Sequence, residues 1–535
     1  MNKKILRYVL FILLLIVVIG SYWYLNFVAS ERLSGLLGDR VKIDGVEVNL
    51  LGRQVRFKAP KVYLDSIEGQ ADLSLDARAG AVTIENFSFL DLVLNKEIGV
   101  GDLRVDSAEL ELVLPTDKLN LQGKKEINLF VRELFTSINL HRFLFRSTNI
   151  RILKGQKRDT LLVVKNFQID ARDIVIDTST VSHVFPLEFG WSKISADSFD
   201  LKAGDFYILS GTDFLIEDTT VTIHQVKLTP SLSREAFVAQ LPHEKALFHL
   251  DVEQITAKDL VWSLENGFEV SSSKVEVDEA QLRVYKDKRP PPQPLVVKPL
   301  LSEVIRQIPM GITLDTITVT NSYIEYEQYP VLFPRSGKIF FDQTYASIYN
   351  LSSDSSRVVN NPMLVTDVQC DFMGEGKLTT QIRMNLLSPT SEFTVYGRLE
   401  ELPVTYVNQV MTPLVGVTAE GTVHHLDFDF EGDDYASSGK LTSEYSDLKI
   451  SIYEDDRDKD WLKTLFGNLV LRNNNHEDSL GYKEGEIYFI RYQNKDFFNY
   501  LWNSIRVGIM DIAVPFHKNP DSTRSSNKPK FKYED

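Results

Sequence analysis

Residues 317–326 read ITVTNSYIEY, and this ten-residue phrase contains the pattern that decides the fold. Ile317 and Val319 alternate with threonines, as expected of a β-strand with one apolar face. The polar pair Asn321–Ser322 then interrupts the alternation before it resumes. Because Asn and Ser satisfy backbone groups where strand pairing is broken, the phrase predicts a strand, a bulge or tight bend, and a continuing strand.

The same phrase recurs along much of the chain. Clear copies begin at Leu103, Phe143, Ile255 and Val275, and looser copies cover 82–89, 164–169 and 194–201. Their irregular spacing excludes a fixed-period solenoid. The repetition predicts a long β-meander instead.

Two segments with helical spacing, 127–138 and 300–308, each precede a copy of the phrase. Phe143 in the first region corresponds to Ile317 in the second, 174 positions later. At this one offset, Leu134, Ile138, Leu140, Phe143 and Phe145 match Ile308, Ile312, Leu314, Ile317 and Val319. The match predicts an internal duplication of a helix–strand–strand unit.

Composition excludes several classes of protein. The 535 residues carry a formal net charge of −15, which argues against nucleic acid as a partner because phosphate binding needs a basic surface. Cys370 is the only cysteine, so neither an intramolecular disulfide nor a cysteine-based zinc site can form. The length permits two to four domains or one extended repetitive body.

The N-terminus carries an uncharged run at 8–29, directly after Lys3, Lys4 and Arg7. Its length suits a transmembrane helix, and the basic flank predicts that residues 1–7 stay in the cytoplasm while the rest is exported. A cleaved signal peptide is the alternative, but the run exceeds the usual 7–15 residues of a signal core, which favours a retained anchor. The expected anchor includes Tyr8, Leu14, Ile19, Trp23 and Val28.

The Pro-rich segment 289–294 predicts a stiff linker and a domain boundary. The expected organisation is an N-terminal β segment at 41–288, a linker and helix at 289–310, a second β region at 311–495, an amphipathic helix at 496–513 and a disordered basic tail at 514–535. The apolar face of the last helix either caps the open end of its own sheet or contacts a membrane or partner. Capping is the favoured interpretation.

No motif predicts catalysis. The chain lacks a phosphate-binding Gly-rich loop with lysine, a Gly-x-Ser-x-Gly elbow and a His-Glu-x-x-His pair. Simple alternation would place His424 and His425 on opposite faces, where they cannot share a metal. Residues 427–432 resemble the opening of a calcium loop, but Ser438 stands where a bidentate Glu is needed. We therefore expect no catalytic residue, no metal and no cofactor.

The C-terminal half carries an ordered set of short segments. FTVYG at 393–397 is followed by a connection with Asn408, then by GTV at 421–423, GKL at 439–441 and YSDLKI at 445–450. Together with the N-terminal anchor and the repeated strand phrases, this order resembles the AsmA-like superfamily of bacterial envelope proteins.

The resemblance implies a mainly β fold, in which a transmembrane helix precedes an elongated, curled antiparallel sheet with a few short helices. The sheet would form a hydrophobic groove, related to bridge-like lipid-transfer proteins, anchored in the inner membrane with the bulk of the chain in the periplasm. Its expected partners are the inner membrane and the acyl chains of lipid, with phospholipid as the expected class. The expected lining is Val105, Leu110, Leu112, Ile317, Val319 and Ile324.

Periodicity alone leaves three ways to cover the apolar face: a sheet closed on itself, two stacked sheets, or a curled trough filled by acyl chains. In the first two, the same six residues would fill a dry core. The main functional alternative is an envelope assembly scaffold, or outer-membrane biogenesis factor, that binds other envelope proteins and no lipid. A membrane-tethered hydrolase is the third hypothesis for the function.

Overall fold

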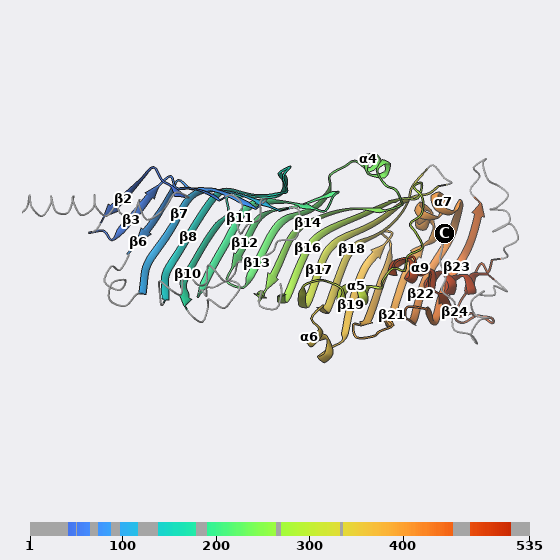
Figure 1. Ribbon diagram of the computed structural model, residues 1–535. Coiled ribbons are helices and arrows are strands. Elements are labelled where there is room, and N and C mark those ends of the chain that lie inside the picture. The colour runs from blue at the N-terminus through green and yellow to red at the C-terminus, as the bar shows by residue number, and fades with distance from the viewer. Residues whose placement is uncertain are drawn as a thin grey trace, which may run out of the picture. The chain divides into compact units, whose positions relative to one another are not determined.

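A computed structural model describes residues 41–49, 51–64, 73–86, 97–115, 137–177, 190–263, 269–331, 335–452 and 471–514 (Figure 1). It divides the chain into two compact units, residues 1–203 with 209–223, and residues 204–208 with 224–535. The anchor predicted at 8–29, the first predicted helix before residue 137 and the tail after residue 514 lie outside the described residues. No helix among the described residues is long and apolar enough to cross a membrane.

Unit 1 is a curled sheet in which each of the two longest strands, β7 (Glu97–Leu114) and β8 (Ser137–Lys154), pairs with two shorter strands. Its other strands are β1 (Val41–Lys42), β2 (Gly45–Asn49), β3 (Gln54–Lys58), β4 (Lys61–Leu64), β5 (Ser74–Arg78), β6 (Ala81–Glu85), β9 (Asp159–Lys165), β10 (Gln168–Asp177) and β11 (Trp191–Ala203). The long strand β7 pairs with β6 along its first half and with β5 along its second. The described pairs are antiparallel except β7–β8.

Unit 2 contains a second run of strands in chain order. These are β14 (Ala246–Lys258), β15 (Val261–Ser263), β16 (Glu269–Asp287), β17 (Gly311–Tyr329), β18 (Gly337–Ser352), β19 (Met363–Phe372), β20 (Gly376–Asn385), β21 (Phe393–Pro403), β22 (Val417–Gly432), β23 (Ala436–Ile452) and β24 (Gly485–Ile490). From β17 onward each strand pairs antiparallel with the next, and β16–β17 is parallel. Strands β12 (Tyr207–Glu217) and β13 (Thr220–Pro230) are divided between the units.

The helices are few and short. They are α4 (Arg234–Ala239), α5 (Leu301–Arg306), α6 (Ser355–Asn360), the 3-10 turn η3 (Val404–Val407), α7 (Asn408–Val415) and α9 (Phe497–Ala513). The mainly β class with a curled, mostly antiparallel sheet is therefore confirmed. The division between the units falls within 204–223, whereas the Pro-rich segment joins two neighbouring strands of unit 2.

The predicted interruptions of the strand phrases are present as residues with a left-handed backbone. The backbone is left-handed, with positive φ, at Ser107, Asp259, Glu279 and Asn321, each within or beside the polar pair of a phrase. The register between β17 and β18 shifts at this point, between Val319 and Ser322. A register shift between β7 and β8 likewise accompanies Ser107. A bulge of this kind bends its strand and increases the local twist of the sheet.

The two parallel pairs support the predicted duplication. Val105 of β7 is in register with Phe145 of β8, and Val277 of β16 is in register with Val319 of β17. The offsets are 277 − 105 = 172 for the first strand and 319 − 145 = 174 for the second. Parallel neighbours require a crossover connection, and in unit 2 that connection holds the Pro-rich segment and α5.

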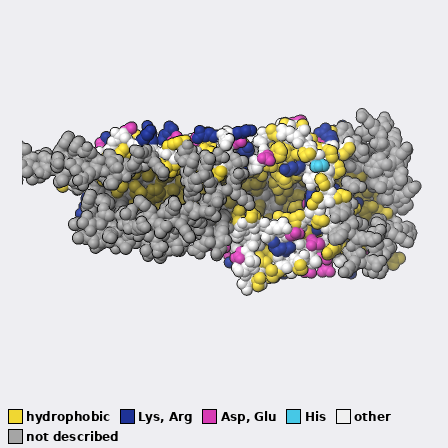
Figure 2. Space-filling model, in the orientation of Figure 1, with side chains coloured by type: hydrophobic (Ala, Val, Ile, Leu, Met, Phe, Trp, Pro, Cys, Tyr) yellow, Lys and Arg dark blue, Asp and Glu magenta, His cyan; other side chains and the backbone are white. Residues whose placement is uncertain are grey.

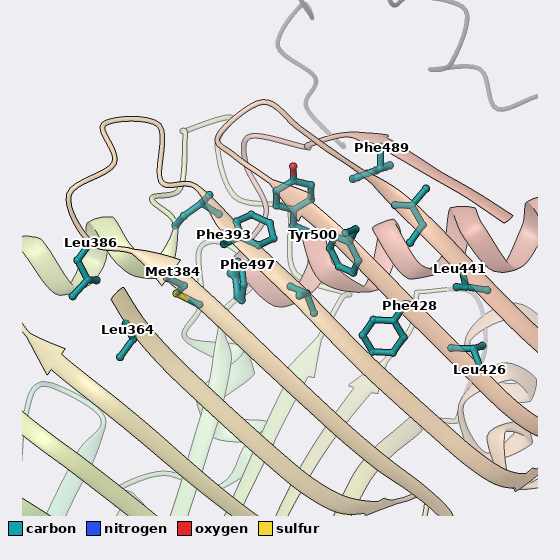
Figure 3. Close-up of a cluster of buried hydrophobic side chains, with 14 of the residues drawn as sticks. Leu364, Met384, Leu386, Phe393, Leu426, Phe428, Leu441, Phe489, Phe497 and Tyr500 are labelled. Carbon is teal, nitrogen blue, oxygen red and sulfur yellow. The ribbon is translucent and has the colours of Figure 1, made fainter. Parts of the chain in front are cut away.

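Unit 2 has a dry core between strands β19–β24 and the helices α5 and α9 (Figure 3). The ring of Phe393 meets those of Phe497 and Tyr500 edge-on, at centroid distances of 5.1 and 5.6 Å. Helix α9 begins at its N-cap Asp496, whose side chain accepts a hydrogen bond from Asn499 N. The amphipathic helix expected at 496–513 thus packs its buried face against β23 and β24, as the capping interpretation requires.

We expect the Cys370 thiol to be nearly inert in the folded chain. It is buried in β19, and burial together with the Asp371 carboxylate raises its pKa to about 12. Against an ordinary value of 9.0, this leaves about a thousandfold less thiolate at pH 8. Alkylation by iodoacetamide should be slow in buffer and fast in urea; rapid labelling without denaturant would contradict the placement of β19.

Candidate functional site

In unit 1, apolar side chains from successive strands form continuous rows on one face of the sheet. Val105 is in register with Val82 on one side and Phe145 on the other. The full row is Val46, Phe57, Val82, Val105, Phe145, Ile169 and Ile194. The row through Leu110 is Val62, Ala77, Leu110, Ile150, Val164 and Phe199, and the row through Leu112 is Leu64, Leu75, Leu112, Ile152, Leu162 and Leu201.

Unit 2 has the same arrangement. The row through Val319 is Ile255, Val277, Val319, Ala346 and Val368, and the row through Ile317 is Ala257, Val275, Ile317 and Ile348. A third row is Leu250, Leu282, Ile324, Phe341 and Phe372. Each unit therefore carries three of the six predicted lining residues on what we call its apolar face, the side defined by these rows.

The predicted lining residues are half-buried, and none of the six is buried as core side chains are. Side chains of the dry core, such as Leu386 and Leu441, are 0% exposed by comparison. Figure 2 shows hydrophobic side chains gathered in a shaded recess of the visible face. In the described part of the chain, these rows are therefore less buried than the dry core of unit 2.

The apolar face of unit 2 changes character along the sheet. The row through Val319 continues across Thr380 and Gly397 to Phe428 and Leu441. At this end α5 and α9 cover the row, and Phe428 and Leu441 are buried in the dry core. The same face is thus half-buried at Val277, Val319 and Ala346 of β16–β18 and fully buried at Phe428 and Leu441 of β22 and β23, next to which α9 packs on β23 and β24.

The opposite face carries charged side chains paired across strands. Arg142 donates two hydrogen bonds to Asp170, at 2.9 and 2.7 Å, and these hold the pKa of Asp170 below its usual value. Glu276 lies 2.9 Å from Lys258 and 2.6 Å from Lys274. Exposed pairs of this kind contribute at most about 1 kcal/mol each, so they mark the face in contact with water.

Asp427, the first acid of the calcium-like segment, belongs to this charged face. It lies in β22, where it accepts a hydrogen bond of 2.9 Å from Arg398. Alternating acids on a strand with one wet face account for this segment, as expected. Among the described residues, no group of His, Cys, Asp or Glu side chains has the arrangement needed to hold a metal ion.

The adjacent histidines do not follow simple alternation. A register shift between Val423 and His425 interrupts β22, so the assumption behind their expected separation fails here. The His424 ring lies 6.5 Å from the ring of His476, while His425 and His476 both lie within 3.6 Å of the Glu444 carboxylate. His424 and His425 thus both lie beside the segment that follows residue 471. The irregularity in β22 that places them there could not be predicted from the alternation of the sequence.

Comparison with known proteins finds no matching family model and no matching curated sequence. The accessible apolar face is the feature from which a function can be inferred. Sequence reasoning found this face through its strand phrases, but it missed the charged side chains that meet it at one end of β16, described below.

Proposed function

We propose that this chain is an inner-membrane-anchored envelope protein whose apolar face binds or transfers lipid, with phospholipid acyl chains as the ligand. The proposal rests above all on one observation: the rows through Val105 and Val319 are continuous, apolar and half-exposed. A soluble sheet that exposes such rows pays about 25 cal/mol for each Å² of apolar surface left in water. An acyl chain lying along the face would remove that cost.

Lipid transfer on such a face needs no covalent chemistry. An acyl chain that leaves a bilayer for the sheet exchanges one apolar environment for another, so its net hydrophobic cost is small. The headgroup must stay hydrated, because an unpaired polar group in an apolar site is costly. A trough open along one side meets both requirements, whereas a closed core meets neither.

The membrane anchor and the periplasmic location belong to the proposal. They rest on the uncharged run at 8–29 with its basic flank, and on the resemblance to AsmA-like envelope proteins. In this arrangement the N-terminal helix would hold one end of the trough against the bilayer that donates or receives lipid. If the strands formed a closed body instead of a trough, the anchor would only tether the chain to the membrane.

The test is to purify the full chain in a neutral detergent, extract it with organic solvent and identify lipid by mass spectrometry. We expect at least one phospholipid per chain, retained through extensive washing. A photo-crosslinking amino acid at position 319 should label lipid in cells. Lipid-free protein that crosslinks only to another protein would refute lipid binding and support the assembly scaffold.

A further inference from the structure

Two lysines near the end of β16 share a single sheltered carboxylate. Lys286 Nζ lies 3.4 Å from Glu244 Oε1, and Lys288 Nζ lies 2.9 Å from Glu244 Oε2. The side chain of Lys286 is 18% exposed, that of Lys288 is 27% exposed and that of Glu244 is 7% exposed. Glu244 is fixed from behind by the Pro-rich segment, because its backbone N donates to Pro291 O at 2.8 Å. We call Glu244, Lys286 and Lys288 the lysine triad.

The lysine triad lies beyond the apolar rows, near the end of β16. Leu282, Val284 and Lys286 alternate along β16, so their side chains lie on the same side of the sheet. Leu282 belongs to the row through Ile324, and Lys286 is in register with Gln328 four pairs farther along. Any molecule lying along β16 and β17 on this face therefore meets the two ammonium groups at its end.

Positive charge is in excess around the triad. Burial lowers the pKa of Lys286, and the ammonium groups of Lys288 and Lys298 lower it further, while Glu244 opposes them. Burial alone would raise the pKa of Glu244, but the two lysines outweigh it and the pKa is lowered.

Two ammonium groups thus share one carboxylate in a sheltered position beside an apolar surface, and Lys298 adds a third positive charge nearby. A sheltered charge without its own partner is unfavourable, and an incoming anion would supply that partner. Two ammonium groups that reach one carboxylate are also spaced to hold two oxygens of one phosphate.

We propose that Lys286 and Lys288 bind the phosphate of an anionic phospholipid whose acyl chains lie along the rows of β16–β18. This inference rests on the proposed function and adds a headgroup preference to it. Free phosphate offers the same oxygens, but it would leave the adjoining rows through Leu282 and Ile324 uncovered. The site therefore favours a phosphate that is attached to acyl chains.

The test measures binding of fluorescent phosphatidylglycerol and phosphatidylcholine, with identical acyl chains, to the full chain in neutral detergent. The variant Glu244→Gln/Lys286→Gln/Lys288→Gln removes all three charges at nearly constant volume and leaves none of them unpaired. Both lipids carry a phosphate, but the choline ammonium of phosphatidylcholine would be repelled by the two lysines, whereas the glycerol of phosphatidylglycerol is neutral. We therefore expect the wild type to prefer phosphatidylglycerol by about tenfold or more. The triple variant should bind both lipids equally.

A matched control lies on the other face of the same strand. Glu276 forms the same kind of triad with Lys258 and Lys274, and Glu276→Gln/Lys258→Gln/Lys274→Gln changes the net charge equally. This control should keep the preference for phosphatidylglycerol. An unchanged preference in the first variant, or an equal loss in the control, would overturn the headgroup site while leaving acyl binding intact.

A further measurement uses inorganic phosphate as a competitor of the two lipids. At millimolar concentration it should compete weakly with phosphatidylglycerol and not with phosphatidylcholine. If phosphate protects the lysine triad from amine labelling but neither lipid does, the site takes free phosphate and the lipid assignment is wrong. If neither lipid binds the wild type at all, the proposed function fails together with this inference.

Discussion

Val319→Asp should remove most of the lipid that the wild-type chain retains. Val319 is half-buried on the apolar face, in register with Val277 and Ala346. A carboxylate there would lie against an acyl chain with no cation beside it, and desolvating an unpaired charge costs several kcal/mol. We expect the amount of bound phospholipid, measured as lipid phosphorus per chain, to fall at least about tenfold, as 1.4 kcal/mol already predicts.

The control for this substitution is Thr316→Asp, on the charged face of the same strand. Thr316 is in register with Lys274, so a carboxylate at this position gains a partner instead of losing one. Lipid content should match the wild type. Slow alkylation of Cys370 in both variants would verify that unit 2 is folded. Equal lipid loss from the two variants would mean that the apolar face is wrongly assigned.

The strand phrases were predictable because their causes are local. Alternation places Ile317 and Val319 on one face, and a polar pair supplies the backbone bulge that Asn321 adopts with positive φ. The match at 174 positions was also detectable, since it compares one local pattern with another. Its extension to β7 and β16 was not, because the offset there is 172 and only the paired registers align the two strands.

The rest depends on contacts between distant parts of the chain. Phe428 and Val319 have the same alternating pattern, yet Phe428 is buried because Leu300 and Tyr500 arrive from far away in sequence to cover that region. Glu244 and Lys286 are likewise 42 positions apart, and in a chain with 74 acidic residues nothing local distinguishes Glu244. Periodicity predicts which face a side chain occupies, but not what covers that face.

Gly508→Leu should separate α9 from the sheet. Gly508 lies against Leu441 and Ile487, and a Cβ added there would be 2.9 Å from Leu441 Cβ and 3.0 Å from Ile487 Cγ1. Neither neighbour can move, because both are at most 1% exposed within the dry core. Overpacking of this kind lowers the free energy of unfolding by about 1–3 kcal/mol or more. The contacts that it weakens are those between α9 and the sheet, which keep β22–β24 dry.

Loss of the α9 contacts should extend the accessible apolar face instead of unfolding the strands. Tyr500 would leave its position against Phe393. Phe428 and Leu441, which continue the row through Val319 into the dry core, would then become half-exposed as Val319 is. We expect Gly508→Leu to increase the fluorescence of a bound apolar dye and to lower the urea midpoint, with the strand signal in circular dichroism retained. Phe498→Leu, at a position 68% exposed on the free side of α9, is the control and should change neither. Dye binding at the wild-type level in Gly508→Leu would show that α9 does not close this end of the face.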